Sequence, residues 1–195
     1  MKKKIYLDHA AATPIDPWVE RVVLKHTKTF GNPSSLHEAG REAKEVLEDS
    51  RKRIAKVLNC RPEEVVFTGA GTESANLAVL GVARAALGNR GRPLVAGAQK
   101  FSGHIITSKI EHHAVLRARE YLEKNEGFKV TYLDVRPNGI VDPEAIRKTL
   151  RPDTILVSIM YANNEIGTVQ PIREIAKILQ DFRNLKLQTT NYKPQ

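Results

Sequence analysis

Residues 69–74 have the composition of an anion-binding loop. They read Gly69-Ala70-Gly71-Thr72-Glu73-Ser74 and lie between a β-branched run, Val65 to Thr68, and an apolar helical pattern. Small residues let the backbone approach a ligand closely, and a helix start offers unpaired N–H groups and a positive dipole end. We therefore expect a phosphate held by the amides around Gly71 and Thr72 and by the Thr72 hydroxyl. A plain tight turn with a threonine N-cap accounts for the same residues equally well.

Two nucleotide-binding loops are alternatives for this segment. A dinucleotide loop requires a third glycine, where Ser74 stands, and an acidic residue about 20 positions later at a strand end. The sequence has neither, and it also lacks the lysine that follows the second glycine in a P-loop. These absences make a nucleotide-binding α/β domain the least favoured of the alternatives.

Two further polar segments each follow a predicted strand. Glu111-His112-His113 comes after the run His104 to Thr107, and Asn163-Asn164 comes after the run Thr154 to Ile159. An imidazole can stack on a planar ring and exchange protons, and amide groups can donate to a ring oxygen or a carboxylate. A loop histidine is more often a surface or capping residue, adjacent histidines are a weak metal signal, and asparagine favours turns. Together the three motifs predict a site for a flat phosphorylated ligand such as pyridoxal 5′-phosphate (PLP).

The elements that position these motifs indicate an α/β fold. After Pro62, short β-rich runs alternate with helical patterns, which predicts a mainly parallel sheet with helices on both faces. Parallel strands end at one edge of a sheet, where open α/β folds bind ligands. The predicted strands are Val65–Thr68, His104–Thr107, Lys129–Leu133 and Thr154–Ile159. The predicted helices after them are Glu73–Leu87, Ala114–Glu126, Pro143–Leu150 and Ile172–Phe182.

Two more helices are predicted before the sheet. Asp16 as N-cap and Pro17 at the first helical position favour a helix to about Thr29. Ser35 and Glu38 have the spacing of a capping box, followed by one long amphipathic helix that extends to Leu58. The segment 88–103 is glycine-rich and basic, and we expect an exposed loop there. The predicted organisation is an arm at 1–15, a large domain at 16–187 and a polar tail at 188–195.

The composition is that of an ordinary globular protein. The net charge is +9, but lysines and arginines are spread along the helices among glutamates, which argues against nucleic-acid binding. No stretch approaches the roughly 20 apolar residues that span a membrane, and the N-terminus lacks the features of a secretory signal. We therefore expect a cytoplasmic protein. One cysteine, Cys60, excludes an internal disulfide, and no Cys/His spacing indicates a structural zinc site.

The chain resembles the class V aminotransferase-type PLP enzymes, and most closely the bacterial cysteine desulfurases. The resemblance is carried by Tyr6 to Pro14, Phe30 to Ser35, Phe67 to Asn76, Thr107 to His112 and Val157 to Gly167, in that order. It covers nearly the whole chain to about Ile178. It implies an incomplete large domain of PLP fold-type I, with the arm at 1–15 belonging to the family's small domain.

By this resemblance, each of the three motifs has a role at the cofactor. Gly71 and Thr72 would hold the PLP phosphate, His112 would stack on the pyridine ring and transfer protons, and Asn164 would approach the ring oxygen and the substrate. Asn32 would lie near the substrate carboxylate. The family loop commonly reads Gly-Ala-Thr-Glu where this chain has Ala70-Gly71-Thr72-Glu73, so a methyl group replaces a hydrogen beside the phosphate.

Several residues that the family uses for the reaction are not in these 195 residues. The family pattern continues to an Asp that pairs with the pyridine nitrogen, a nearby Gln, a Ser-x-His-Lys segment with the cofactor lysine, and a persulfide cysteine on a mobile loop. Ser102-Gly103-His104 is not that segment, because Ile105 stands at the lysine position and the run precedes His112. Cys60 lies at a predicted helix end, and we expect it to be structural.

Three hypotheses follow. The first is a truncated or split cysteine desulfurase, inactive alone, whose complete form converts L-cysteine to L-alanine and a protein-bound persulfide for iron–sulfur cluster assembly. PLP would bind this part non-covalently at best, and a homodimer, a complementary C-terminal half and a sulfur-accepting scaffold protein would be its partners. The second is a noncatalytic binding or dimerisation module, because an unpaired sheet edge needs cover. The third is the nucleotide-binding domain.

Overall fold

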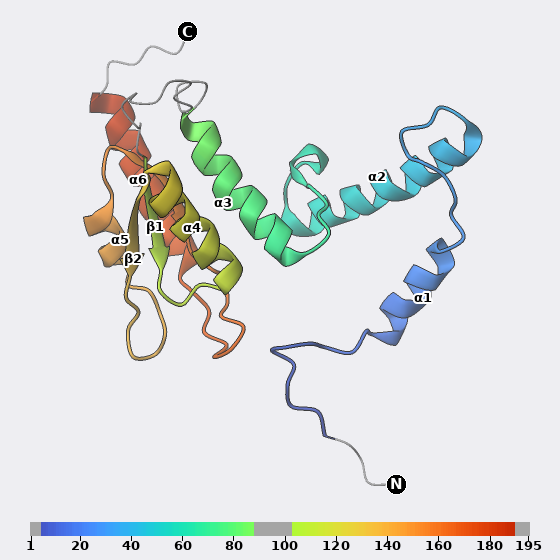
Figure 1. The fold of residues 1–195 in the computed structure, drawn as a ribbon, viewed down its shortest axis with the longest axis horizontal. Helices are drawn as coiled ribbons and strands as arrows, with labels where there is room; N and C mark the ends of the chain where they lie inside the picture. Colours follow the sequence, from blue (N-terminus) through green and yellow to red (C-terminus); the bar gives the residue numbers. More distant parts are fainter. Residues whose placement is uncertain (1–4, 88–102, 190–195) are drawn as a thin grey trace. The chain divides into compact units, whose positions relative to one another are not determined.

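The computed structural model describes residues 5–87 and 103–189. Contacts along the chain divide it into two compact units, residues 1–67 and residues 68–195 (Figure 1). The predicted domain boundaries at residues 15 and 187 stay predictions. Most of the predicted 88–103 loop, residues 88–102, lies outside the described residues.

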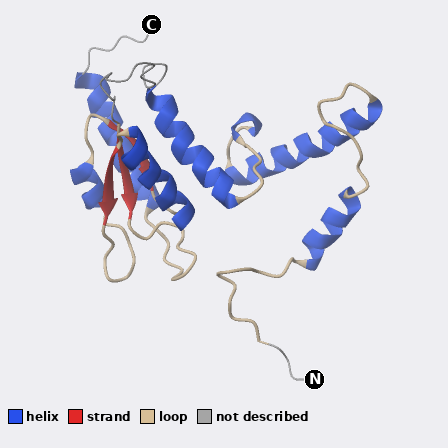
Figure 2. Cartoon of the chain, in the orientation of Figure 1, coloured by secondary structure: helices blue, strands red, loops and turns tan. Residues whose placement is uncertain are grey.

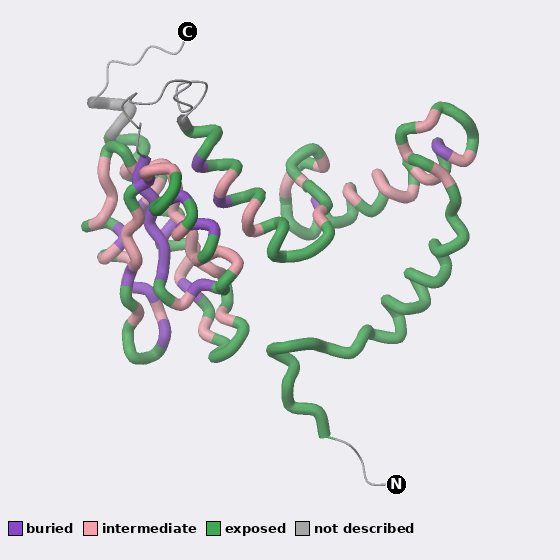
Figure 3. The backbone as a smooth tube through the Cα atoms, in the orientation of Figure 1, coloured by how far each residue is buried: buried purple, intermediate pink, exposed green. Residues whose placement is uncertain are grey.

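The second unit is built on a three-stranded parallel sheet in the order β2-β1-β3. β1 (His104–Ser108) lies between β2 (Lys129–Leu133) and β3 (Thr154–Ser158), and Ile105 pairs with Val130 on one side and Leu156 on the other. All five residues of β1 are buried, as expected of a central strand (Figure 3). The α/β class and the parallel sheet predicted from the sequence are confirmed.

Helices cover both faces of this sheet (Figure 2). Ile105 packs with side chains of α3 (Gly71–Leu87) and α4 (His113–Glu126) in one core, which also contains Val79, Ala83, Ala118, Leu122 and Phe128. Its neighbour Ile106 packs in a second core with Leu133, Val141, Ile146 and Ile175, under α5 (Pro143–Thr149) and α6 (Ile172–Thr189). Successive strand residues point to opposite faces, so the two isoleucines separate the two cores.

A buried histidine joins the three strands at the end where they begin. His104 Nδ1 lies 2.8 Å from the Thr154 hydroxyl on β3, and Nε2 lies 2.8 Å from the Thr131 hydroxyl on β2. The Thr154 hydroxyl oxygen also accepts from the Arg151 backbone N–H at 2.9 Å, so its own proton is free to bond to the ring. This network holds the three strands in register.

The first unit contains α1 (Pro17–His26), α2 (Glu38–Leu58) and one turn of 3-10 helix, η1 (Pro62–Glu64). Asp16 caps α1 as predicted, with Oδ1 accepting from the Trp18 N–H at 2.7 Å. The predicted capping box of α2 is wrong, because the N-cap is His37, whose Nδ1 accepts from the Gly40 N–H. Ser35 instead belongs to the preceding turn, where its N–H donates to the Asn32 carbonyl at 2.9 Å.

The predicted strand Val65–Thr68 does not form. These residues follow η1 as irregular backbone, and the Val65 carbonyl accepts a hydrogen bond from the Arg51 guanidinium of α2. The same guanidinium lies 4.9 Å from the centre of the Phe67 ring. These two contacts of Arg51 hold residues 65–68 against α2. The apolar run therefore packs on this helix and does not form a strand of the sheet.

Helix ends differ from the predictions by small amounts, except in α6. α1 ends at His26, three residues before the predicted Thr29, while α6 continues to Thr189, past the predicted Phe182. Gln188 and Thr189 of the predicted polar tail are therefore helical, and residues 190–195 lie outside the described part. Among the described residues, no helix has the length and apolar character needed to cross a membrane.

Candidate functional site

The predicted anion loop forms the start of α3. The first-turn amides of Gly71, Thr72 and Glu73 have no acceptor among the described residues, and the Thr72 side chain is exposed and unbonded there. A β-carbon added to Gly71 would have no neighbour within 4 Å, so there is open space at this backbone. Unpaired N–H groups with space before them suit an anion.

Glu73 closes the loop on its other side. Its Oε2 accepts from the Gly69 N–H at 2.7 Å, which folds the loop back over the first turn of α3. The Ser74 hydroxyl bonds to the Thr68 hydroxyl, which fixes the entry to the helix. Glu73 and Ser74 therefore shape the loop, and the free amides are those that follow Ala70.

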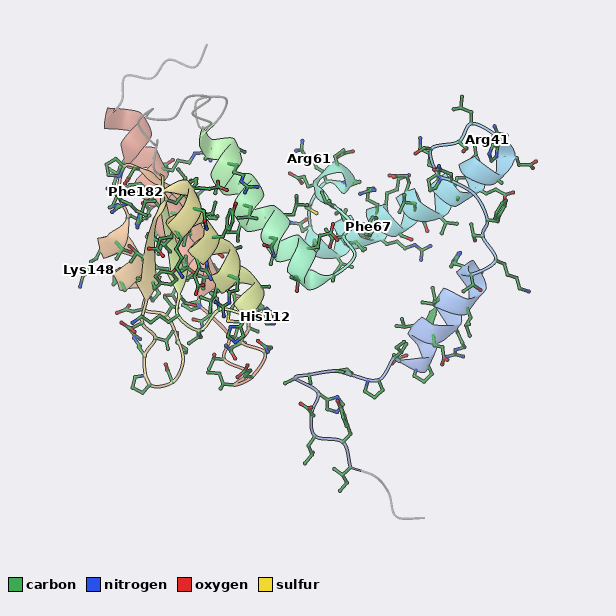
Figure 4. The ribbon with its side chains drawn as sticks, in the orientation of Figure 1. Arg41, Arg61, Phe67, His112, Lys148 and Phe182 are labelled. Atoms are coloured by element: carbon green, nitrogen blue, oxygen red, sulfur yellow. The ribbon has the colours of Figure 1, made fainter. Side chains whose placement is uncertain are left out.

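His112 lies at the start of α4 and is its N-cap (Figure 4). Nδ1 accepts from the Ala114 backbone N–H at 3.1 Å, which leaves the ring proton of the neutral form on Nε2. The ring is exposed. The capping role that the sequence left open is therefore real, and it also holds the imidazole at the edge of the sheet.

The starts of α3 and α4 lie at the same end of the second unit. The two helices pack side by side and run in the same direction (Figure 1). Near their far ends, Arg84 of α3 forms an ion pair with Glu126 of α4, with Nη2 and Oε1 2.5 Å apart. Arg84 and Glu126 lie equally far from the first residues of their helices, Gly71 and His113. The anion loop and His112 therefore occupy one edge.

The two asparagines of the third motif have different roles. Asn163 folds its own loop, because its Oδ1 accepts from the Glu165 and Ile166 N–H groups at 2.9 and 3.0 Å. Its Nδ2 donates to the Ile110 carbonyl at 3.0 Å, in the loop before His112. Asn164 is exposed and its side chain has no hydrogen bond within the described residues. Of the pair, Asn164 is the one free to meet a ligand.

A buried carboxylate joins the same two loops. Glu111 Oε1 accepts from the Ser108 hydroxyl at 2.9 Å and from the Met160 N–H, just after β3, at 2.7 Å. With the Asn163 bond, this makes two ties between the His112 loop and the Asn164 loop. In the sequence, Glu111 is grouped with the histidines, and its role in connecting the two loops is not predicted. The reason is that a polar motif does not show whether its carboxylate is buried.

The loop after β2 completes this edge. Gln170 is buried, with Oε1 accepting from the Val141 N–H at 2.9 Å and Nε2 donating to the Gly139 carbonyl at 2.8 Å. Gly139 has a φ of +76°, and a β-carbon there would lie 2.7 Å from the Ile166 side chain. The loops after all three strands are thus bonded to one another, and the edge that carries His112 and Asn164 is a connected structure.

Asn32, the residue predicted to lie near a substrate carboxylate, belongs to the first unit. Its Oδ1 accepts from the Ser34 N–H at 2.9 Å, so Nδ2 remains as a donor. Gly31 and Gly40 let this turn pack closely on α2, since a β-carbon on Gly40 would lie 2.8 Å from the Asn32 carbonyl. Cys60, also in this unit, is half-buried directly after α2, and its N–H donates to the Ala55 carbonyl.

The fold agrees with what the chain is similar to. The aminotransferase class-V model matches residues 5–188, and the chain belongs to that family. It is 48% identical over 183 residues to the cysteine desulfurase IscS of Dictyoglomus turgidum, covering 93% of this chain and 43% of that protein. It is 45% identical over 182 residues to the putative cysteine desulfurase IscS 1 of Bacillus subtilis, covering 93% and 45%.

Solved structures give the same relationship. The chain superposes on SspA in complex with cysteine with a TM-score of 0.80 at 36% identity, over 91% of this chain and 48% of that one. It superposes on a NifS-like protein with a TM-score of 0.79 at 38% identity, over 92% and 46%. The chain thus spans less than half the length of these relatives.

Proposed function

We propose that this chain is the N-terminal part of a PLP-dependent cysteine desulfurase. The observation that carries the proposal is the gathering of the α3 start, His112 and Asn164 on one edge of the sheet, in a member of the class-V aminotransferase family. The complete enzyme would convert L-cysteine to L-alanine and an enzyme-bound persulfide, the sulfur supply for iron–sulfur clusters.

The start of α3 would hold the cofactor phosphate. The free first-turn amides and the Thr72 hydroxyl are all donors, and the helix dipole adds positive potential at the same place. The open space at Gly71 allows a phosphate oxygen to approach the backbone. Ala70 is exposed, with its carbonyl accepting from the Ser74 N–H, so its methyl group need not enter this space.

His112 and Asn164 would hold the cofactor ring. Because Nδ1 of His112 is occupied by the α4 backbone, the residue can offer its ring face for stacking and its Nε2 for proton transfer. Asn164 has an unused amide that can donate to the ring oxygen. When bound, PLP would supply the electron sink that weakens bonds at the α-carbon of the amino acid.

Asn32 would bind the substrate carboxylate. With Oδ1 already accepting from Ser34, the remaining Nδ2 group has the polarity that a carboxylate requires. The partner of this chain would be a second copy, in a homodimer, or a complementary C-terminal half. A scaffold protein would receive the sulfur.

The 195 residues by themselves should bind ligand and not complete the reaction. They contain no Ser-x-His-Lys segment, and Cys60 follows the C-cap of α2 in the first unit. A lysine is needed to capture the cofactor aldehyde and move the α-proton. We expect PLP to bind this part without a covalent bond.

A second candidate function is a noncatalytic dimerisation or binding module. Large apolar side chains of the first unit are exposed, including Trp18, Val23, Leu36 and Val57. Exposed apolar surface of this extent indicates a partner. A second copy of the chain could provide it as well as a C-terminal half could.

Reconstitution tests the leading proposal. This chain is mixed with the C-terminal part of the Dictyoglomus turgidum relative, PLP, L-cysteine and a thiol reductant, and L-alanine is measured. We expect alanine from the mixture and none from either part, and we expect the His112→Ala variant to lower the yield. A soluble pair that associates and gives no alanine contradicts the proposal and favours the binding module.

A further inference from the structure

The hydrogen bond that caps α4 also decides which nitrogen of His112 carries the ring proton. Nδ1 accepts from the Ala114 backbone N–H at 3.1 Å, and this amide has no other acceptor among the described residues. A backbone N–H can only donate, so the nitrogen that it bonds keeps its lone pair and stays unprotonated. The next two amides, of Val115 and Leu116, donate to the His112 carbonyl at 2.9 and 3.1 Å and do not compete for the ring.

The charged and titratable neighbours of His112 in the chain are engaged elsewhere. The Glu111 carboxylate is buried and bonded to the end of β1 and to the backbone after β3. The Lys109 ammonium pairs with Asp134, with Nζ and Oδ1 2.6 Å apart. The centre of the His113 ring lies 6.4 Å from that of His112, at an interplanar angle of 62°. Among the described residues, the α4 backbone is therefore the hydrogen-bond partner that orients the His112 ring.

We propose that Ala114 is a positioning residue, whose backbone amide fixes His112 in the Nε2–H tautomer and makes the capped ring a hydrogen-bond donor that cannot accept a proton. Nε2 already carries the ring proton, and the cap holds the Nδ1 lone pair. A ligand group that meets Nε2 must then be an acceptor, such as a carboxylate or a phenolic oxygen. The inference rests on the proposed function only in treating His112 as a ligand-binding residue.

Proton transfer through Nε2 is consequently coupled to the cap. Nε2 can take a proton from a ligand only when it has a lone pair, and the ring then carries its own proton on Nδ1. That Nδ1–H would face the Ala114 N–H, donor against donor, so the cap must open first. The transfer forms an N–H bond at Nε2 while the ligand keeps the electron pair. The imidazolium then gives its Nδ1 proton to water, and the cap forms again.

Nitrogen NMR of the full, isotope-labelled chain without ligand reads the tautomer directly in weakly alkaline buffer. We expect an acceptor-type shift for His112 Nδ1, a proton-bearing shift for Nε2, and a coupling across the hydrogen bond between Nδ1 and the Ala114 amide nitrogen. His113 is the internal reference, because its ring is exposed and has no hydrogen bond within the described residues. A missing coupling, or a tautomer ratio in His112 equal to that in His113, would overturn the proposal.

Two proline variants separate the cap bond from the helix start itself. Ala114→Pro removes the donating N–H in the first turn, and should lower the ratio of Nε2–H to Nδ1–H in His112 about fivefold. His113→Pro is the matched control, since it puts proline at the first helical position after a residue with φ −59° and ψ 143°, which suits a following proline. It keeps the Ala114 amide and should leave the ratio within about twofold.

An unchanged ratio in Ala114→Pro, or an equal fall in both variants, contradicts the role of the Ala114 amide. If Ala114→Pro does not fold, the coupling and the tautomer ratio in the wild-type chain still decide the question.

A binding measurement distinguishes this inference from the proposed function. Pyridoxine 5′-phosphate, which carries an alcohol in place of the aldehyde and so cannot react with lysines, serves as the probe. We expect His112 in the complex to keep the proton on Nε2 and the coupling to Ala114, and an Nδ1–H ring in the complex would overturn the donor role. If the wild-type chain does not bind the probe, the proposed function fails, while the ligand-free tautomer still decides the role of the Ala114 amide.

Discussion

At the scale of single residues, the side chains of the candidate site combine structural and binding roles. His112 caps α4 through one nitrogen and leaves its ring face and the other nitrogen exposed. The side chain of Asn163 forms hydrogen bonds within its own loop, whereas the side chain of its neighbour Asn164 forms none within the described residues. The sequence could not separate these two asparagines, because both are polar and adjacent, and only the path of the backbone decides which amide turns inward.

The two roles of His112 can be separated by substitution. His112→Ala removes the cap and the ring, and should lower the free energy of unfolding by about 1 kcal/mol. His112→Asn keeps a good capping side chain and should leave stability nearly unchanged. Both should weaken binding of pyridoxine 5′-phosphate. Denaturant titration and calorimetric binding measure the two effects, with His113→Ala as the exposed neighbouring control; equal stability of the Ala and Asn variants contradicts the capping role.

His104 makes stability depend on pH. Burial lowers the pKa of His104, Arg151 and Lys129 lower it further, and Asp153 partly opposes them. The unfolded chain then binds a proton near pH 6.5 while the folded chain does not, so stability is full above that pH and declines below it, toward the lowered folded pKa. His104→Gln should flatten this part of the stability curve. An unchanged slope in the variant would show that other groups cause it.

At the scale of elements, the loops after the three strands form one bonded edge. The sequence predicted the parallel sheet and the motifs at its edge because alternating β-rich and helical runs carry that information. It did not predict that Glu111 and Gln170 are buried ties, because their partners come from loops far along the chain. Val65–Thr68 was predicted as a strand because propensity does not show that Arg51 bonds to its backbone.

Substitution of Gly139 tests whether this edge is rigid, and substitution of Gly81 in α3 provides the comparison. Gly139→Ala should lower the free energy of unfolding by about 1–2 kcal/mol, because Gly139 has a positive φ and its β-carbon would collide with Ile166. Gly81 lies within α3 with open space around it, so Gly81→Ala should raise that free energy by about 0.5–1 kcal/mol. Thermal and denaturant unfolding measure both. A neutral Gly139→Ala variant would mean that the loop moves independently of its neighbours.

At the scale of the whole molecule, the two units differ in how much they bury. The second unit has two apolar cores, one on each face of its sheet. In the first unit, the buried helical residues among those described are Gly40 and Ala55, and α1 buries none. Relatives of more than twice this length supply further chain, and the exposed apolar side chains of the first unit are where we expect it to pack.

This difference predicts uneven protection of backbone amides. Amides of Ile105 and Ile106 should exchange slowest in the full chain, because β1 is buried and paired on both sides. Amides of α1 should exchange fast in this chain alone and slow down when a C-terminal half is added. Exchange in α1 as slow as in β1, with no partner present, would contradict the difference in burial between the two units.

The central claim is that the start of α3, His112 and Asn164 form one ligand site. The most direct test is to add pyridoxine 5′-phosphate to the isotope-labelled chain and map amide shifts by NMR, with pyridoxine as the control without phosphate. We predict saturable shifts at Gly71, Thr72, His112 and Asn164 with one dissociation constant, and much weaker effects of pyridoxine. Shifts that cluster elsewhere, or that saturate at different concentrations in the three loops, would contradict the account.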